Sequence, residues 1–222
     1  MLSLTLAAAV RKDGIAMIRK PTELESADCI KLIYMSGPEL FSYFFIEREP
    51  EVYRYINVFY TKPDVMFSSE NVWVKVENDK VCGLLLSLPS KVMKQTEKNM
   101  MKYGKELTKT VGLRNSIRMM LRSGLQKYLT SVNHDDEYYI CNLAVSEAYR
   151  GRGFGVELLH KAEELAKEQG FSKISLAVEL RNSDAKRIYE KFGFRQTAGV
   201  EFPRKYHKHS IDGFYKMVKI LE

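Results

Sequence analysis

Six residues in the second half of the chain, Arg150 to Gly155, combine two arginines with three glycines in the order R-G-R-G-F-G. An apolar run over residues 138–145 precedes them, and after Gly155 apolar residues recur at helical spacing. The predicted order is therefore strand, glycine turn and helix. Glycines let the backbone approach a ligand closely, and the first N–H groups of a helix have no partner inside it. Such a turn can bind a diphosphate, and Arg150 and Arg152 add positive charge at the same place.

Two common phosphate-binding motifs do not fit this turn. A Walker loop ends in Gly-Lys-Ser or Gly-Lys-Thr, which the turn lacks. A dinucleotide fingerprint requires G-x-G-x-x-G, and counting from Gly151 its last glycine falls on Val156. Glu179 ends the next predicted strand, where nicotinamide enzymes place a ribose-binding acid, but too few residues follow it to complete a doubly wound sheet. A purely structural turn is a further alternative.

The pattern that fits is R-x-x-G-x-G, filled by Arg150, Gly153 and Gly155. Leu-Ala-Val at residues 143–145 precedes it, and Asn182, Ala185 and the run Y-E-K-F-G-F at residues 189–194 follow it. With these motifs the chain resembles the GNAT family of acetyl-CoA-dependent N-acetyltransferases. The resemblance is specific over residues 138–194, looser over residues 17–88 and the C-terminal strands, and absent over residues 89–135.

The resemblance implies a role for each motif. Backbone groups of Leu143 and Val145 would pair with the pantetheine arm of CoA, and the Leu143 N–H would stabilise the oxyanion formed at the thioester carbonyl. Tyr189 occupies the position of the proton donor, and a phenol with an ordinary pKa of about 10 is protonated at neutral pH. A core tyrosine on an amphipathic helix is the alternative to this role. The expected cofactor-binding residues are Leu143, Ala144, Val145, Arg150, Gly151, Arg152, Gly153, Phe154, Gly155, Asn182 and Tyr189.

The match to the family is weaker at the general base. Family members often carry a carboxylate on the strand before the turn, and an ungapped alignment places Tyr139 at that position. Glu137 lies two residues earlier, on the same face of an extended strand, and is the candidate base, acting through water. Cys141 is not assigned as a nucleophile because its neighbours in the strand are apolar.

Composition limits the class of protein. The chain has 222 residues, a net charge of +7 and three cysteines without paired spacing. These features are typical of one soluble domain in a reducing compartment, and we expect a cytoplasmic protein without a membrane span. The positive charge attracts phosphate-bearing substrates such as CoA, and we do not expect a nucleic-acid partner. His207 and His209 alternate on a predicted strand, but without a third ligand they do not indicate a metal site.

Periodicity predicts helices that alternate with a sheet. Residues 90–130 are expected to be helical with a break at Gly112 and with the apolar face docked on the core. The opposite, solvated face carries a row of lysines: Lys91, Lys94, Lys98, Lys102, Lys105 and Lys109. A lid over an acidic acceptor, or a surface for anionic lipid or nucleic acid, is the alternative for this row. The expected strands are 15–19, 71–77, 81–88, 138–145, 174–178 and 214–220, and the other expected helices are 22–35, 40–46, 155–169 and one that begins at Asn182.

The sequence thus predicts an N-terminal extension over residues 1–16 and a single mixed α/β acetyltransferase domain over residues 17–222. Its sheet is expected to be mostly antiparallel, with a helical insertion at about residues 89–135. The expected reaction is direct transfer of the acetyl group of acetyl-CoA, without a metal, to an amine of a small molecule or a protein. Two alternatives are a non-catalytic CoA-binding regulatory module and an acyltransferase that uses a longer acyl-CoA. We make no prediction of the oligomeric state.

Overall fold

A seven-stranded sheet forms the centre of the protein, which is a computed structural model describing residues 16–222. The strand order is β1-β2-β3-β4-β5-β7-β6, and every neighbouring pair is antiparallel except β4–β5. The mixed, mostly antiparallel α/β fold is therefore confirmed. The strands are β1 (Ala16–Arg19), β2 (Val72–Glu77), β3 (Lys80–Pro89), β4 (Tyr138–Val145), β5 (Lys173–Glu179), β6 (Arg195–Glu201) and β7 (Gly213–Ile220).

The expected N-terminal extension lies outside the described residues except for Ala16, which pairs with Glu77 in β1. No helix within residues 16–222 is long and apolar enough to cross a membrane.

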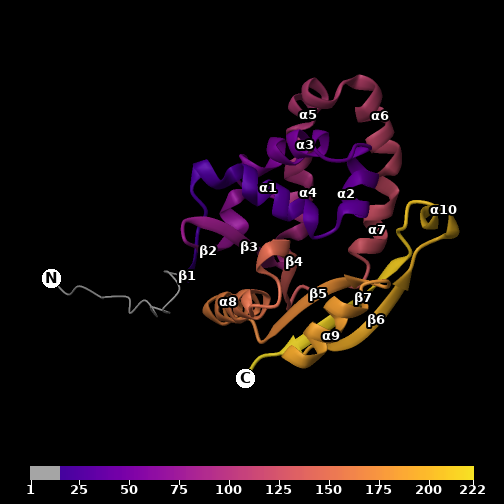
Figure 1. Cartoon of the computed structure of the whole chain (residues 1–222). Coiled ribbons are helices and arrows are strands. Elements are labelled where there is room, and N and C mark those ends of the chain that lie inside the picture. The colour runs from indigo at the N-terminus through magenta and orange to yellow at the C-terminus, as the bar shows by residue number, and fades with distance from the viewer. Residues whose placement is uncertain (1–15) are drawn as a thin grey trace.

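Two groups of helices cover the sheet (Figure 1). On one side, α1 (Ser26–Met35), α2 (Pro38–Phe45) and α3 (Glu51–Tyr60) pack against β2, β3 and β4. On the other side, α8 (Phe154–Glu168) packs against β3, β4 and β5, and α9 (Ser183–Phe192) contacts β7 through Lys186 on Tyr215 and Phe192 on Lys219. The expected helix over residues 22–35 begins as a short 3-10 turn, Glu23–Glu25, before α1.

Helix α3 has no counterpart among the elements expected from the sequence. Its composition, EVYRYINVFY, is rich in residues that favour strands. However, Val52, Ile56 and Phe59 are all buried, and this spacing of three to four residues is helical. Packing of that face against α1 therefore outweighs the local strand preference.

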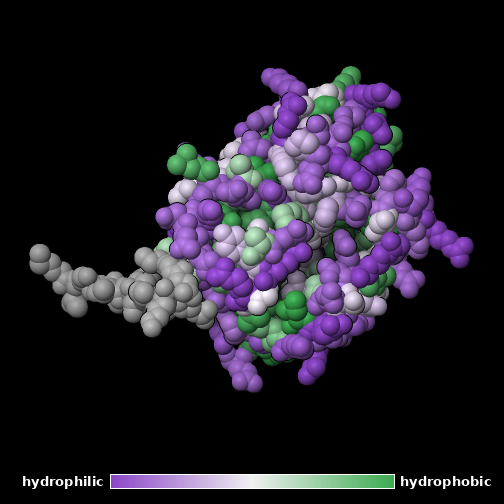
Figure 2. Space-filling model, viewed as in Figure 1, coloured by the Kyte–Doolittle hydropathy of each residue, from purple (hydrophilic) through white to green (hydrophobic). Residues whose placement is uncertain are grey.

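Between β3 and β4 the chain forms what we call the helical segment, residues 90–129. It breaks at Gly112, as expected, where φ is +80°, and also at Tyr103. The lysine row is exposed as expected, while the opposite face packs against the core. Figure 2 shows that hydrophilic side chains cover most of the visible surface. The segment comprises α4 (Ser90–Lys102), α5 (Gly104–Val111), α6 (Leu113–Arg122), a 3-10 turn (Ser123–Leu125) and α7 (Gln126–Leu129).

The prediction of a strand around His207 and His209 was wrong. The chain there forms a short helix, α10 (Arg204–His207), followed by a turn. The His207 ring contacts the Phe202 carbonyl oxygen, and the His209 ring packs against Tyr43 with 5.1 Å between centroids. These two histidines therefore help to pack the β6–β7 connection, and no cluster of potential metal ligands is found within residues 16–222.

Candidate active site

Strands β4 and β5 separate part-way along their length. They pair at Tyr138–Ile174, Tyr139–Ser175 and Ile140–Leu176, and then pairing stops although β4 continues to Val145 and β5 to Glu179. On the other edge of β4, Ser87 pairs with Ile140 whereas Leu86 pairs with Asn142, so Cys141 forms a bulge. A bulge bends a strand and increases its twist, which explains why β4 turns away from β5 here.

The separation leaves backbone groups of β4 without a strand partner. The Ser146 N–H donates to the Cys82 carbonyl, toward β3. Because successive N–H groups of a strand point to opposite edges, those of Leu143 and Val145 point toward the gap between β4 and β5. The Val145 carbonyl accepts a hydrogen bond from Arg150 Nε at 3.3 Å. The Ala144 side chain, by contrast, is buried in the core beneath α1.

The glycine turn lies at the start of α8. Gly151 and Gly153 have φ values of +76° and +85°, a left-handed conformation that disfavours side chains. Within residues 16–222, no backbone carbonyl accepts from the N–H groups of residues 151–155, whereas Val156 and Glu157 donate to the Gly153 carbonyl. Free N–H groups at the positive end of a helix dipole form a site suited to a phosphate group.

The two arginines of the turn occupy different environments. Arg152 donates two hydrogen bonds of 2.7 Å to the buried Glu77 carboxylate, and its guanidinium lies over the Phe154 ring at 4.9 Å. Its charge is therefore neutralised within the protein. Arg150 remains more than half exposed, and its only ion-pair partner within the described chain is Glu147, at 3.7 Å. Arg150 is consequently the arginine available to a phosphate at this turn.

Helix α9 follows β5 and positions two of the expected residues. The Asn182 side chain caps it by accepting a hydrogen bond from the Ala185 N–H at 3.1 Å, and Gly193 ends it with a φ of +104°. Tyr189 is half-buried among the residues that pack beneath α8, and its ring contacts Phe194. Burial raises the pKa of Tyr189 to about 12, so the phenol is protonated at any physiological pH.

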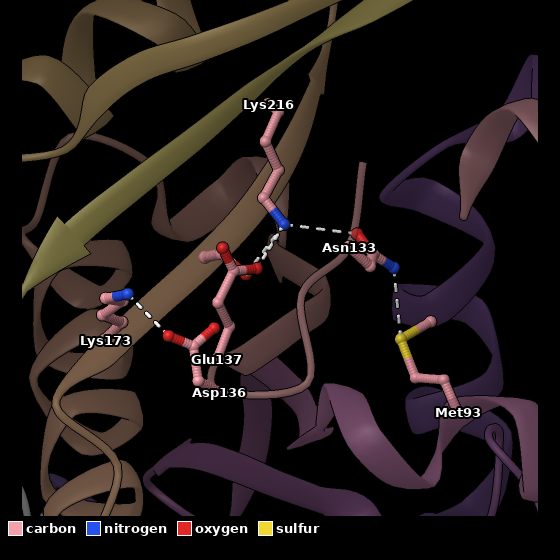
Figure 3. Close-up of polar contacts among 7 residues, drawn as sticks. Met93, Asn133, Asp136, Glu137, Lys173 and Lys216 are labelled. Atoms are coloured by element: carbon pink, nitrogen blue, oxygen red, sulfur yellow. Dashed lines mark hydrogen bonds and ion pairs between the residues drawn. The ribbon is translucent and has the colours of Figure 1, made fainter. Parts of the chain in front are cut away.

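Glu137 is buried and forms an ion pair with Lys216 (Figure 3). Its carboxylate accepts hydrogen bonds from Lys216 Nζ at 2.5 Å and from Ser175 Oγ at 2.8 Å. Lys216 also donates to Asn133 Oδ1 at 3.2 Å, within the loop that joins the helical segment to β4. Burial lowers the pKa of the Lys216 ammonium group. These contacts join the start of β4 to β5 and β7, and we propose that Glu137 serves this structural role rather than that of a general base.

A cavity of about 500 Å³ lies on the α1–α2 side of the gap. It reaches β4 at Tyr139, Cys141 and Asn142, and the end of β5 at Glu179. The Glu179 side chain remains accessible to solvent, and its partial desolvation, with the nearby charges of Glu39 and Asp212, raises its pKa. Sequence reasoning considered Glu179 only as a ribose-binding acid, although its place at the end of β5 was the available signal.

A family model described as the acetyltransferase (GNAT) family matches residues 39–194, which is more than half of the chain. The chain belongs to the GNAT family. The resemblance noted in the sequence is therefore confirmed, and so is the corresponding fold.

Individual relatives match more locally. A putative ribosomal protein bS18-alanine N-acetyltransferase of Bacillus subtilis (strain 168) is 38% identical over 65 residues, 29% of this chain and 42% of the relative. The chain spans less than half the length of the first curated relatives it matches.

Solved structures match over nearly the whole fold. An N-acetyltransferase from Staphylococcus aureus Mu50 has a TM-score of 0.64 and 22% identity, over 91% of this chain and 99% of that one. The NatC complex bound to Gag peptide and CoA gives a TM-score of 0.52 and 18% identity, over 93% of this chain and 99% of that one. At these identities the likeness shows the fold.

The surroundings of Glu137 generate a testable prediction. Glu137→Gln leaves the Lys216 ammonium buried without its counter-ion, so we expect the free energy of unfolding to fall by about 3–5 kcal/mol. The double variant Glu137→Leu/Lys216→Met, which removes both charges, should recover most of that loss. Denaturant unfolding measures both effects. A Glu137→Gln protein with unchanged stability and a rate of acetyl transfer reduced about 100-fold would contradict this role and restore Glu137 as the base.

Proposed function

We propose that this GNAT protein transfers the acetyl group of acetyl-CoA directly to an amine. The single observation that carries the proposal is the separation of β4 from β5 beside the free N–H groups of the glycine turn. One ligand that combines an extended amide-bearing arm with a diphosphate would satisfy both sets of backbone groups. Coenzyme A has these two parts.

The proposed binding mode assigns a task to each group. The pantetheine arm lies along β4 and pairs with Leu143 and Val145, while the diphosphate is bound by the N–H groups of residues 151–155 and by Arg150. In this mode the Leu143 N–H donates to the thioester carbonyl oxygen and stabilises its negative charge as the amine attacks. Phe154 contributes through its backbone N–H, because its side chain is buried, whereas Ala144 faces β3 with its backbone and only links the two residues that pair with the arm. Asn182 and Tyr189 flank the arm from α9.

The proposed chemistry needs an acid and a base. The amine nitrogen attacks the thioester carbon, the C–S bond breaks, and Tyr189 gives its proton to the departing thiolate. Burial raises the pKa of the nearby Cys141 thiol, and it would likewise make the CoA thiolate in this gap a stronger base that accepts the phenolic proton. Glu179 accepts the proton that the amine loses, through water, and returns it to Tyr189 by the same route.

Direct transfer is favoured over a covalent intermediate. Cys141 is the cysteine in the gap, and a nucleophilic cysteine must ionise. Burial raises the Cys141 pKa, which keeps the sulfur protonated at neutral pH. All three cysteines are free thiols, which supports the proposal of a reducing, cytoplasmic location.

Two alternatives remain distinguishable by experiment. An acyltransferase that uses a longer acyl-CoA would place its acyl chain in the cavity, and a non-catalytic module would bind CoA without turnover. A protonated phenol, Tyr189 beneath α8, and a carboxylate of raised pKa, Glu179 in the cavity lining, favour an enzyme over a binding module.

Gly153→Asp tests the site for CoA. A carboxylate at the N-terminus of α8 would repel the diphosphate, so we expect CoA binding to be lost in calorimetry. Gly170→Asp is the matched control, because Gly170 has a similar φ of +76° but lies beyond the opposite end of α8. It should suffer comparable backbone strain and keep its CoA affinity. Equal CoA affinities for a folded Gly153→Asp protein and the wild type would refute the proposed site.

Tyr189→Phe tests the acid. The phenylalanine ring keeps the packing that Tyr189 makes against Phe194, so we expect little change in the free energy of unfolding. The acetylation rate should fall roughly 10²–10⁴-fold, the usual effect of losing a general acid, with acetyl-CoA affinity retained. Tyr215→Phe, in the same core cluster, serves as the control and should keep its rate. A fully active Tyr189→Phe enzyme would exclude the phenol as the proton source.

The pH dependence of the rate tests Glu179. A general base acts when deprotonated, so the rate should rise with pH through the Glu179 pKa, which lies above the ordinary value of about 4.3. Glu179→Gln should abolish this acidic limb and lower the rate roughly 10²-fold or more. Glu39→Gln removes one of the charges that raise this pKa, so it should move the limb to lower pH and preserve the maximal rate. If the acidic limb of the pH–rate profile persists in Glu179→Gln, then another group is the general base.

A further inference from the structure

The cavity beside the gap has an apolar wall that extends well beyond the reacting centre. α2, α4, α6 and the loop before β2 supply phenylalanine and methionine side chains to it, and the helical segment closes it on one side. Its volume of about 500 Å³ is within the usual range of small-molecule sites. The apolar wall includes Phe41, Phe44, Phe45, Phe67, Met100 and Met119.

At the end of the cavity near β4 and β5, the chemistry changes to hydrogen-bond acceptors. Asn142 is about nine-tenths buried, and its Oδ1 has no hydrogen-bond partner within residues 16–222. Its Nδ2 donates to Ser36 Oγ at 2.7 Å. Because the Ser36 hydroxyl donates its own hydrogen to the Ile33 carbonyl, Ser36 must accept from Asn142, which fixes the amide orientation.

Two carboxylates, those of Asp212 and Glu179, line the same cavity as the Asn142 amide oxygen. Asp212 pairs with Arg181 through Oδ2, while its buried Oδ1 has no partner within the described residues. A buried acceptor without a donor costs free energy, so the ligand that belongs here must bring N–H groups to this end.

We infer that the acceptor substrate is a primary amine on an uncharged, apolar body, such as an aralkylamine or a long alkylamine. This inference rests on the proposed acetyl transfer and specifies its acceptor. The amine would donate to Asn142 Oδ1 beside the place of the thioester, and the body would fill the phenylalanine and methionine wall. A long acyl chain in the same cavity would bring only methylene groups and leave the acceptors without donors. A polyamine or an aminoglycoside would place further charged or hydroxyl groups against the apolar wall, at the cost of desolvating them.

The test measures amine binding separately from turnover. Calorimetry on the 222-residue chain compares tryptamine and octylamine with spermidine and kanamycin, and thiol release from acetyl-CoA is followed with the same four amines. We expect tryptamine and octylamine to bind at least 10-fold more tightly than the other two and to support faster thiol release. Tighter binding of spermidine or kanamycin, or faster turnover of octanoyl-CoA than of acetyl-CoA, would overturn the inference.

Two neighbouring methionines of α6 provide matched variants. Met119 lines the cavity and is half-buried, whereas Met120 is 67% exposed and is not part of the wall. Met119→Lys adds a positive charge that repels the amine and makes the wall polar, so tryptamine binding should weaken at least 10-fold. Met120→Lys adds the same charge one residue away and should leave tryptamine binding unchanged. Equal tryptamine affinities for the two variants would contradict the placement of the ligand.

A second variant maintains the test if Met119→Lys fails to fold. Asn142→Leu removes the unpartnered oxygen and should weaken tryptamine binding roughly 10-fold, the effect of one hydrogen bond to a charged group. Unchanged binding would overturn the role of Asn142. Failure of the proposed function gives a different result: tryptamine binds, the variants weaken it as expected, and no amine triggers thiol release from acetyl-CoA.

Discussion

The separation of β4 from β5 after Ile140 and Leu176 is the constraint on which the rest of the site depends. A strand in the middle of a sheet normally satisfies its backbone groups on both edges, and β4 does so only toward β3 beyond this point. The Cys141 bulge produces the separation, and it also reverses the alternation of side chains. Cys141 and Asn142 therefore both border the same cavity. One irregularity in one strand thus opens a channel for a ligand and supplies a polar group to its wall.

Two ion pairs from β2 hold the glycine turn in position against the sheet. Lys75 pairs with Glu157 in the first turn of α8, and Glu77 pairs with Arg152 just before it. Both β2 side chains are buried, so these pairs are far less screened by solvent than the exposed pair of Arg150 and Glu147. The two arginines, which look equivalent in the sequence, therefore differ in role. Arg152 fixes the turn, and Arg150 is available to a ligand at its surface.

The parts of the fold that local signals specify could be predicted from the sequence. Glycines with positive φ mark the turn before α8 and the end of α9. The Asn182 cap marks the start of α9. β6 was not predicted because it is a mostly exposed edge strand without apolar alternation. The environment of the candidate base depends on distant residues. Lys216, the partner of Glu137, lies 79 positions away, and the charges around Glu179 come from α2 and from the loop before β7. Such contacts leave no local pattern, which is why the sequence offered Glu137 as the base and Glu179 was not considered for that role.

The methionines of the cavity wall have a consequence for selectivity. Methionine side chains are unbranched and polarizable, so they change rotamer readily to fit differently shaped apolar groups. A wall that combines Met66, Met93, Met100 and Met119 with aromatic rings therefore discriminates weakly by shape and strongly by polarity. Each methylene buried in such a wall contributes about 0.8 kcal/mol, whatever its exact position. The expected signature is a graded preference that increases with the length of the apolar body, rather than a sharp optimum for one molecule.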